Sequence, residues 1–265
     1  MINNFPKIMG VLNVTPDSFS DGGKYFEKNK AVEHALEMAW DGAEIIDVGG
    51  ESTRPGAAPV PELEELKRVI PVIKGIKEQL PKIKISIDTT KLFVAMAAVD
   101  AGAEIINDIS GLNIDPNLAR LAAKKEITII LMHIQGSPRT MQANPFYHNV
   151  VDDVYNELEK KIDLARSYGV TSVIADVGIG FGKTLEHNLE LLKNHNKFKS
   201  LGVPLLLGIS RKSFIGKILD ENNPEERDIP TTLLYALLLD CGADIIRVHN
   251  VKLITMLKKL SQAVS

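Results

Sequence analysis

The sequence predicts a single domain spanning residues 1–265, folded as a closed (β/α)₈ barrel. Eight short runs rich in Val, Ile and Leu recur along the chain, and longer segments with helical spacing of apolar residues lie between them. The length of 265 residues is typical of one such barrel. A pattern that begins Gly-Ala also occurs three times. An open, doubly wound parallel sheet remains the alternative, because it is built from the same units.

The expected strands are nearly continuous in apolar residues, which is typical of strands that are buried on both faces. They are Ile8–Val14, Glu44–Val48, Ile83–Asp88, Glu104–Ile109, Thr128–His133, Ser172–Val177, Pro204–Ile209 and Asp244–His249. The segments between them alternate apolar and polar residues with the period of a helix. The clearest of these expected helices are Lys30–Asp41, Leu63–Gln79, Lys91–Ala101, Val150–Tyr168 and Thr231–Cys241.

The repeated pattern marks three equivalent strand ends. It reads GAEIID at residues 42–47, GAEIIN at 102–107 and GADIIR at 242–247. Each glycine follows a helical segment, and we expect it to end that helix in the left-handed conformation. The strand that follows then finishes on a polar residue, which is Asp47, Asn107 or Arg247.

Composition and charge exclude several classes of protein. The formal net charge is −3 and no basic stripe is present, which argues against a nucleic-acid binder. No apolar run approaches roughly 18 residues, and the first ten residues do not resemble a signal peptide. The one cysteine, Cys241, cannot form an internal disulfide and lies in an apolar stretch, so we expect a buried structural thiol. A cytoplasmic protein is expected.

Three of the loops that follow strands are unusually long. They run from Thr15 to about Glu27, from Gly50 to about Pro61 and from Ile134 to about His148. All three belong on the face of the barrel formed by the carboxyl ends of the strands. Long loops on that face usually carry function.

Nearly every expected strand finishes on a polar residue, although the wall of a barrel should be apolar. Taken singly, each such residue is better explained by a structural hydrogen bond at the rim. So many polar groups on one face fit a ligand site better. The residues are Asn13, Asp47, Asp88, Asn107, Asp108, His133, Asp176, Ser210, Arg211, Lys212, Arg247 and His249.

These polar residues divide into two chemical groups. Asp88, Asn107 and Asp176 could read a flat heterocycle that presents N–H donors and a carbonyl. The two carboxylates also leave open an acid–base pair or a metal site. Arg247 and His249 lie on the last strand, which neighbours Asn13 of the first strand if the barrel is closed. Cationic and amide groups there suit a phosphate or pyrophosphate, with or without a metal ion.

The glycine-rich run at residues 178–184 reads GIGFGKT and is similar to the end of a nucleotide P-loop. The spacing fails by one position, because Val177 stands where the leading glycine would be needed. The run is better interpreted as a sharp turn that lets the backbone approach a ligand. Zinc motifs such as CxxC and HExxH do not occur.

Taken together, these segments resemble the dihydropteroate synthase family over nearly the whole chain. The two longest matching motifs are MGVLNVTPDSFSDGG at residues 9–23 and DVGGESTRPG at residues 47–56. The shorter ones, similar in order and spacing, are residues 86–89, 106–108, 132–133, 178–183, 210–213 and 247–249.

The resemblance implies a reaction. The family joins p-aminobenzoate to 6-hydroxymethyl-7,8-dihydropterin pyrophosphate and releases pyrophosphate in folate biosynthesis. It also implies Mg²⁺ as cofactor, sulfonamides as inhibitors and a homodimer. Implied catalytic residues are Asp88, Asp176 and Lys212.

The resemblance also implies three subsites. The pterin pocket comprises Asp88, Asn107, Met132, Asp176, Phe181 and Lys212. The pyrophosphate site comprises Asn13, Arg247 and His249, with Asn13 also a Mg²⁺ ligand. The p-aminobenzoate region comprises Phe19, Thr53, Arg54, Pro55, Ser210 and Lys212. Neither His133 nor Asp47 receives a role.

The chain departs from the family pattern at two positions. Val177 follows Asp176 where proline is common, and Asn250 follows His249 where aspartate is common. Three other functions are alternatives to a synthase. A pterin-binding methyltransferase does not need the first two loops or the Arg–His pair, and a silent paralogue usually lacks a loop or an anion residue. A phosphate-binding isomerase predicts a glycine-rich loop after the seventh strand, where Ser210-Arg211-Lys212 stands instead.

Overall fold

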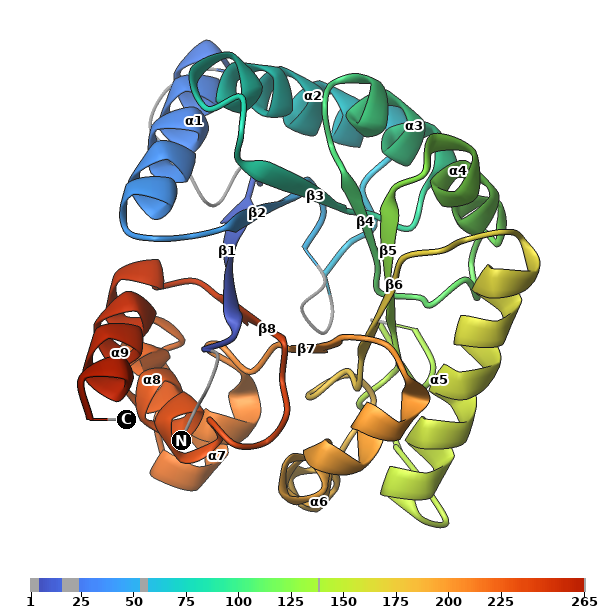
Figure 1. Cartoon of the computed structure of the whole chain (residues 1–265), viewed down its shortest axis with the longest axis vertical. Coiled ribbons are helices and arrows are strands. Elements are labelled where there is room, and N and C mark those ends of the chain that lie inside the picture. The colour runs from blue at the N-terminus through green and yellow to red at the C-terminus, as the bar shows by residue number, and fades with distance from the viewer. Residues whose placement is uncertain (1–4, 16–23, 53–56, 138, 265) are drawn as a thin grey trace.

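The computed structural model describes residues 5–15, 24–52, 57–137 and 139–264, and it is a closed barrel of eight parallel strands. The strands follow one another around the barrel in chain order, and β8 pairs with β1 to close it. Helices form a ring outside the strands (Figure 1). The predicted barrel is therefore confirmed, and the open sheet is excluded.

All eight strands lie within or beside the predicted runs. They are β1 Lys7–Asn13, β2 Ile45–Gly49, β3 Lys84–Asp88, β4 Ile105–Asp108, β5 Thr128–Met132, β6 Val173–Asp176, β7 Leu205–Leu207 and β8 Ile245–Val248. The helices are α1 Lys24–Trp40, α2 Glu62–Gln79, α3 Leu92–Asp100, α4 Asn117–Lys125, α5 Val150–Ser167, α6 Leu185–Lys193, α7 Ser213–Leu219, α8 Asp228–Leu237 and α9 Val251–Val264. Short 3₁₀ helices occupy His195–Leu201 and Glu225–Arg227.

Two helices start more than one residue before the predicted position. Helix α1 begins at Lys24, so the first loop is shorter than the expected 15–27. Helix α8 begins at Asp228 rather than Thr231 and ends at Leu237 rather than Cys241. Pro230 lies in the first turn of α8, where the missing N–H has no helical partner to lose.

The three repeated glycines adopt the predicted conformation. The φ angles of Gly42, Gly102 and Gly242 are +111°, +113° and +84°. A side chain at any of these positions would strain the backbone. The repeat therefore reflects three equivalent helix-to-strand turns.

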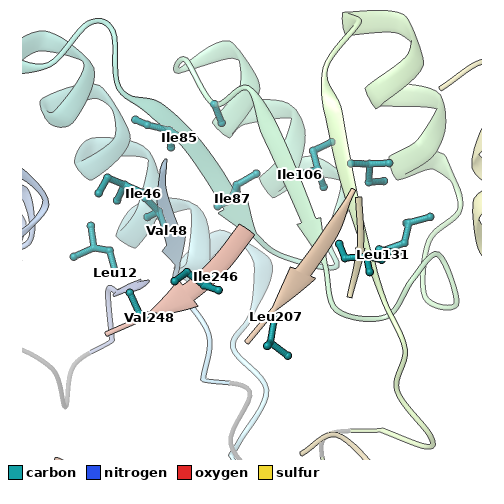
Figure 2. Close-up of a cluster of buried hydrophobic side chains, with 14 of the residues drawn as sticks. Leu12, Ile46, Val48, Ile85, Ile87, Ile106, Leu131, Leu207, Ile246 and Val248 are labelled. Carbon is teal, nitrogen blue, oxygen red and sulfur yellow. The ribbon is translucent and has the colours of Figure 1, made fainter. Parts of the chain in front are cut away.

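Side chains along each strand alternate between the barrel interior and the surrounding helices. The interior is filled by an apolar plug made of Met9, Ile45, Ile105, Ile130, Ile174, Leu206 and Ile245. The residues between them pack in the larger core shared with the helices, among them Ile46, Val48, Ile87, Ile106 and Ile246 (Figure 2). The two sets interleave because successive side chains of a strand point to opposite faces.

This alternation decides which polar strand ends face inward. Asp47 lies between the outward-facing Ile46 and Val48, and Asn107 follows the outward-facing Ile106. The same period places Asp88, Asp176 and Arg247 inside the barrel mouth, above the apolar plug. Asp108 and His133 have the opposite parity and face the helices.

Two further predictions concern membrane-spanning helices and the burial of Cys241. Among the described residues, no helix is long and apolar enough to cross a membrane. Cys241 is only partly buried, although a buried thiol was expected. It still packs against the main core, and burial raises the pKa of its thiol.

Candidate active site

Arg247 joins two carboxylates at the centre of the barrel mouth. Its Nε donates to Oδ2 of Asp47 over 2.7 Å, and its Nη2 donates to Oδ2 of Asp88 over 3.0 Å. The same Oδ2 of Asp47 accepts the Nδ2 hydrogen bond of Asn107 at 3.0 Å. Strands β2, β3, β4 and β8 thus meet in one hydrogen-bonded group.

The Asp88 carboxyl is held close to its titration point at neutral pH. Burial, followed by the negative charge of Asp47, raises its pKa to about 7, while Arg247 opposes that rise. Glu65 and Asp108 add smaller effects in the same direction as burial. A carboxyl of this kind can bind an N–H donor when it is ionised.

Asp176 ends β6 beside a turn that requires glycine. Its Oδ1 accepts the backbone N–H of Gly178 at 2.8 Å, and burial raises the pKa of its carboxyl. Gly178 has φ of +66°, and a Cβ there would lie 1.9 Å from the carbonyl oxygen of His133. The turn therefore approaches β5 as closely as only glycine allows, which confirms the interpretation of the run as a sharp turn.

Lys212 reaches across this turn from the loop after β7. Its Nζ donates to the carbonyl oxygen of Ile179 and lies 4.7 Å from the centroid of the Phe181 ring. Burial lowers its pKa to about 8, although the charge of Asp176 acts against that change. Phe181 packs on a small apolar cluster that contains Met132. The resulting wall is apolar and aromatic, with one cation on it.

His249 and Ser210 form a second polar contact at the rim. The hydroxyl oxygen of Ser210 accepts the backbone N–H of His249 at 3.1 Å and lies 2.9 Å from its Nδ1. If the hydroxyl donates to Nδ1, then Nε2 carries the ring proton and can donate to an anion. The predicted pyrophosphate and p-aminobenzoate regions thus touch through these two residues.

Two inward-facing positions carry no side chain. A Cβ on Gly49 would lie 3.5 Å from Cβ of Asp88, and a Cβ on Gly208 would lie 3.9 Å from Oδ2 of Asp176. Glycine at both positions therefore adds no side-chain atoms beside the two carboxylates. A cavity of about 200 Å³ also opens beside Asp88, between the loops that follow β2, β3, β4 and β5.

The structure brings together most of the residues that the sequence singled out. Asp88, Asn107 and Arg247 share one group, Lys212 contacts Phe181, and Ser210 contacts His249. Asn13 ends β1, which lies between β2 and β8. The remaining four predicted residues lie outside the described part of the chain: Phe19, Thr53, Arg54 and Pro55.

A buried network behind the site was not assigned by sequence reasoning. Nζ of Lys183 donates to the carbonyl oxygens of Gly178 and Phe181, each at 2.9 Å, and lies 3.0 Å from Nδ1 of His133. Nε2 of His133 lies 3.1 Å from Glu157 on α5. This network holds the glycine turn that carries Phe181, and it gives His133 a supporting role outside the pocket.

The charges in this network follow from burial. Desolvation, followed by the nearby Lys183, lowers the pKa of His133 to about 4, so its ring is neutral, and burial lowers the pKa of Lys183 well below its ordinary value. Burial opposes ionisation of Glu157, but hydrogen bonds from His133 and Lys161 lower its pKa to about 2. A neutral His133 can donate through Nε2 to Glu157 and accept at Nδ1 from Lys183.

A second network, of ion pairs and hydrogen bonds, fixes the start of the loop after β2 and was also not predicted from the sequence. Lys91 donates to both Glu51 and Glu65, and Nη1 of Arg68 donates to the carbonyl oxygen of Gly50 at 2.9 Å. Glu65 is fully buried on α2, four residues before the buried Val69. The sequence signal was a charge at a core position of a helix, which calls for a buried partner.

Asn250 has a structural role at the position where the family pattern commonly has aspartate. Its Nδ2 donates to Oδ2 of Asp228 at 3.1 Å, and its Oδ1 accepts the backbone N–H of Leu253 at the start of α9. Asp228 also holds Arg211 through two hydrogen bonds of 2.6 and 2.8 Å. Asn250 therefore supports the loop after β7 through Asp228 and Arg211. Val177, the other departure from the family pattern, packs in the main core.

The side chains at the barrel mouth offer few ligands for a metal ion. Within the described ranges, no three side chains of His, Cys, Asp or Glu gather to hold one. Asn13 offers an amide oxygen at the rim. Mg²⁺ commonly takes one or two protein oxygens and completes its shell with substrate phosphates and water. The residues present therefore fit an ion that arrives together with a phosphorylated ligand.

Comparison with known proteins now identifies the family. The model of the family described as "pterin binding enzyme" matches residues 9–249. The chain belongs to the pterin-binding enzyme family. It is 47% identical over 258 residues to the dihydropteroate synthase of Synechocystis, covering 97% of this chain and 89% of that protein.

Solved structures give the same relationship. The dihydropteroate synthase of Xanthomonas albilineans with 4-aminobenzoic acid matches with a TM-score of 0.91 and 40% identity, covering 99% of this chain and 94% of that one. The Yersinia pestis enzyme in complex with a sulfonamide drug matches with a TM-score of 0.91 and 40% identity, covering 98% and 94% of the two chains. These members of the family are synthases.

Proposed function

We propose that this protein is a dihydropteroate synthase, which joins 6-hydroxymethyl-7,8-dihydropterin pyrophosphate to p-aminobenzoate and releases pyrophosphate. The observation that carries the proposal is the bridge from Arg247 to Asp47 and Asp88, because it sets an anion-binding group directly beside a heterocycle-binding group. The high identity to dihydropteroate synthases over nearly the full chain supports it.

The pterin is read by acceptors on one side and a stacking surface on the other. Asp88 and Asp176 accept ring N–H donors, and Asn107 accepts through its carbonyl oxygen. Phe181 and Met132 form the apolar wall on which the ring lies, with Lys212 close to it. Burial of the carboxylates makes these hydrogen bonds stronger than they would be in water.

Departure of pyrophosphate is the first chemical step. The C–O bond between the pterin methylene and pyrophosphate breaks, and both electrons leave with the oxygen. Arg247 and His249 bind the departing anion, and Asn13 supplies a ligand for Mg²⁺. When bound, Mg²⁺ neutralises charge on the leaving group. The ionised forms of Asp88 and Asp176 stabilise the cation that develops on the pterin.

Attack by the aromatic amine completes the reaction. The nitrogen lone pair of p-aminobenzoate forms the C–N bond to the methylene, and one amine proton is released to solvent. Ser210 and Lys212 bind on the p-aminobenzoate side together with Phe19, Thr53, Arg54 and Pro55 of the two long loops. Holding the amine against the methylene and excluding water favours this product over hydrolysis.

A pyrophosphate-release assay with both substrates and Mg²⁺ tests the proposal. Release is expected to require p-aminobenzoate, and chelation of Mg²⁺ is expected to slow it while the pterin still binds. Sulfonamides are expected to compete with p-aminobenzoate. Release that does not depend on p-aminobenzoate rejects the proposed function, and uncompetitive inhibition rejects the proposed pocket.

Self-association into a homodimer belongs to the same proposal. Exposed apolar side chains recur at every fourth position on two neighbouring helices, with Ile229, Leu233 and Leu237 on α8 and Met256, Leu260 and Val264 on α9. Exposed apolar side chains repeated along two neighbouring helices are typical of a protein interface. Sedimentation should give a dimer, and Leu233→Glu should shift it toward monomer. A monomeric wild type rejects the homodimer.

A cytoplasmic location completes the proposal. The one cysteine, Cys241, is only partly buried and unpaired, which suits a reducing compartment. Cell fractionation tests this expectation.

A further inference from the structure

Asp47 is the most completely buried charged group of the site, and the mechanism above gives it no contact with a substrate. Its relative exposure is 0%. A single oxygen, Oδ2, accepts from both Asn107 and Arg247. Its other oxygen, Oδ1, is buried and has no hydrogen-bond partner among the described residues. A buried carboxylate with one unpartnered oxygen is costly, which calls for a reason beyond holding strands together.

The contact with Asp47 fixes the orientation of the Asn107 amide. An ionised carboxylate only accepts hydrogen bonds, so Asn107 must turn its nitrogen toward Asp47. Its carbonyl oxygen is then the atom that remains for a ligand. With a neutral or missing neighbour at position 47, the amide could rotate and present its nitrogen instead. The Asn107 amide nitrogen would then face the ring N–H of the pterin, and two donors cannot form a hydrogen bond.

The same oxygen fixes the position of Arg247. The guanidinium is planar, and Nε and Nη2 are engaged by Asp47 and Asp88 respectively. These two contacts set the plane of the group and do not use its Nη1 donors. Arg247 side-chain exposure is 23%, so the group is partly open to an incoming anion.

We infer that Asp47 is a positioning residue for substrate recognition, which acts through Asn107 on the pterin and through Arg247 on the pyrophosphate. The inference rests on the proposed function, because it deepens the description of the same site. It differs from a purely structural role, in which Asp47 would only hold β2, β4 and β8 together.

Three variants separate the two roles. Asp47→Asn keeps the shape and removes the charge, and Asp47→Ala removes the acceptor. Ser86→Ala is the matched control, since Ser86 pairs with Asp47 in register and its buried hydroxyl has no partner among the described residues. Each protein is assayed for turnover and for binding of 6-hydroxymethyl-7,8-dihydropterin, with its folded fraction checked by thermal unfolding.

The expected result is selective. At saturating pterin pyrophosphate, the KM for p-aminobenzoate should stay within about twofold, while kcat/KM for pterin pyrophosphate falls about ten- to hundredfold in the Asp47 variants. Asn107→Ala alone should weaken pterin binding, and adding Asp47→Ala should cost little more, because both act on one contact. Ser86→Ala should behave like the wild type.

Other outcomes overturn the inference. They are additive losses of pterin binding in the double variant, equal losses for both substrates, or a Ser86→Ala variant as impaired as Asp47→Ala. If Asp47→Ala does not fold, Asp47→Asn alone decides between the two roles by the same comparison. A wild type that releases no pyrophosphate rejects the proposed function instead, and the pterin-binding comparison still tests Asp47.

Discussion

Nη2 of Arg247 donates to Oδ2 of Asp88 across 3.0 Å, which joins the proposed anion-binding cation to the proposed pterin-binding carboxylate. Arg247 also neutralises Asp47, so one guanidinium balances two buried acids. The residue therefore supports folding as well as catalysis.

Arg247→Ala should therefore reduce both properties. We expect a loss of about 10³-fold in kcat/KM, because a donor to the leaving anion is removed. We also expect a loss of about 2 kcal/mol in the free energy of unfolding at pH 8, a figure reduced for the partial exposure of the group. Chemical denaturation measures the second effect, and Arg247→Lys serves as the charge-conserving control.

The stability loss in Arg247→Ala should shrink on acidification. The pKa of Asp88 is raised to about 7, so its ionisation disfavours folding as the pH rises through that value. Below it Asp88 is neutral and needs the cation less. An Arg247→Ala protein as stable as the wild type at pH 8 would contradict the pairing.

Ionisation of Asp88 should be visible in the pH profile. Because the ionised carboxylate accepts the pterin N–H, kcat/KM for pterin pyrophosphate should rise with pH and level off above about 7. Asp88→Asn should lower kcat/KM and remove this limb, while any limb that belongs to the substrate persists. Retention of the whole limb in Asp88→Asn would assign the titration elsewhere.

Lys212 should set the alkaline side of the same profile. Burial lowers its pKa to about 8, so its charge, and with it the cation on the Phe181 wall, is lost as the pH rises above that value. Activity should decline there. Lys212→Arg should keep its charge and show no decline in that range, even if its maximum is lower. A decline identical in both proteins would exclude Lys212 as its cause.

The network of His133, Lys183 and Glu157 behind the pocket should make the free energy of unfolding fall at acidic pH. His133 has a folded-state pKa of about 4 against the ordinary 6.5, so its contribution is complete above pH 6.5 and is lost as the pH falls toward 4. The largest effect is about 3 kcal/mol in the free energy of unfolding. His133→Asn should show a shallower pH dependence. His34→Asn, at an exposed histidine of α1, should match the wild type.

The sequence predicted the barrel because its signal is repetitive and local. Buried parallel strands are apolar throughout, and the turns before β2, β4 and β8 require a glycine with positive φ. Both properties depend on short stretches of chain. The helix boundaries were less certain, as α8 illustrates, since a proline in the first turn is compatible with either a helix start or a loop.

The candidate site was predicted as a set of residues but not as a set of contacts. Asn107, Asp88 and Arg247 were recognisable as polar ends of strands. Their link through Asp47 joins residues as far apart in the chain as Asp47 and Arg247. His133 shows the reverse case, because the same polar strand end points to the helices and binds Lys183 and Glu157.

The sequence by itself determined the closed barrel, the family and the polar residues of its mouth, because strand periodicity and motif spacing are local properties of the chain. Only the tertiary structure decided which of those residues contact one another through a hydrogen bond or an ion pair. That depends on barrel closure, which sets β8 beside β1, and on the parity of each strand. These two geometric facts put Arg247 between Asp47 and Asp88 and set His133 behind the pocket.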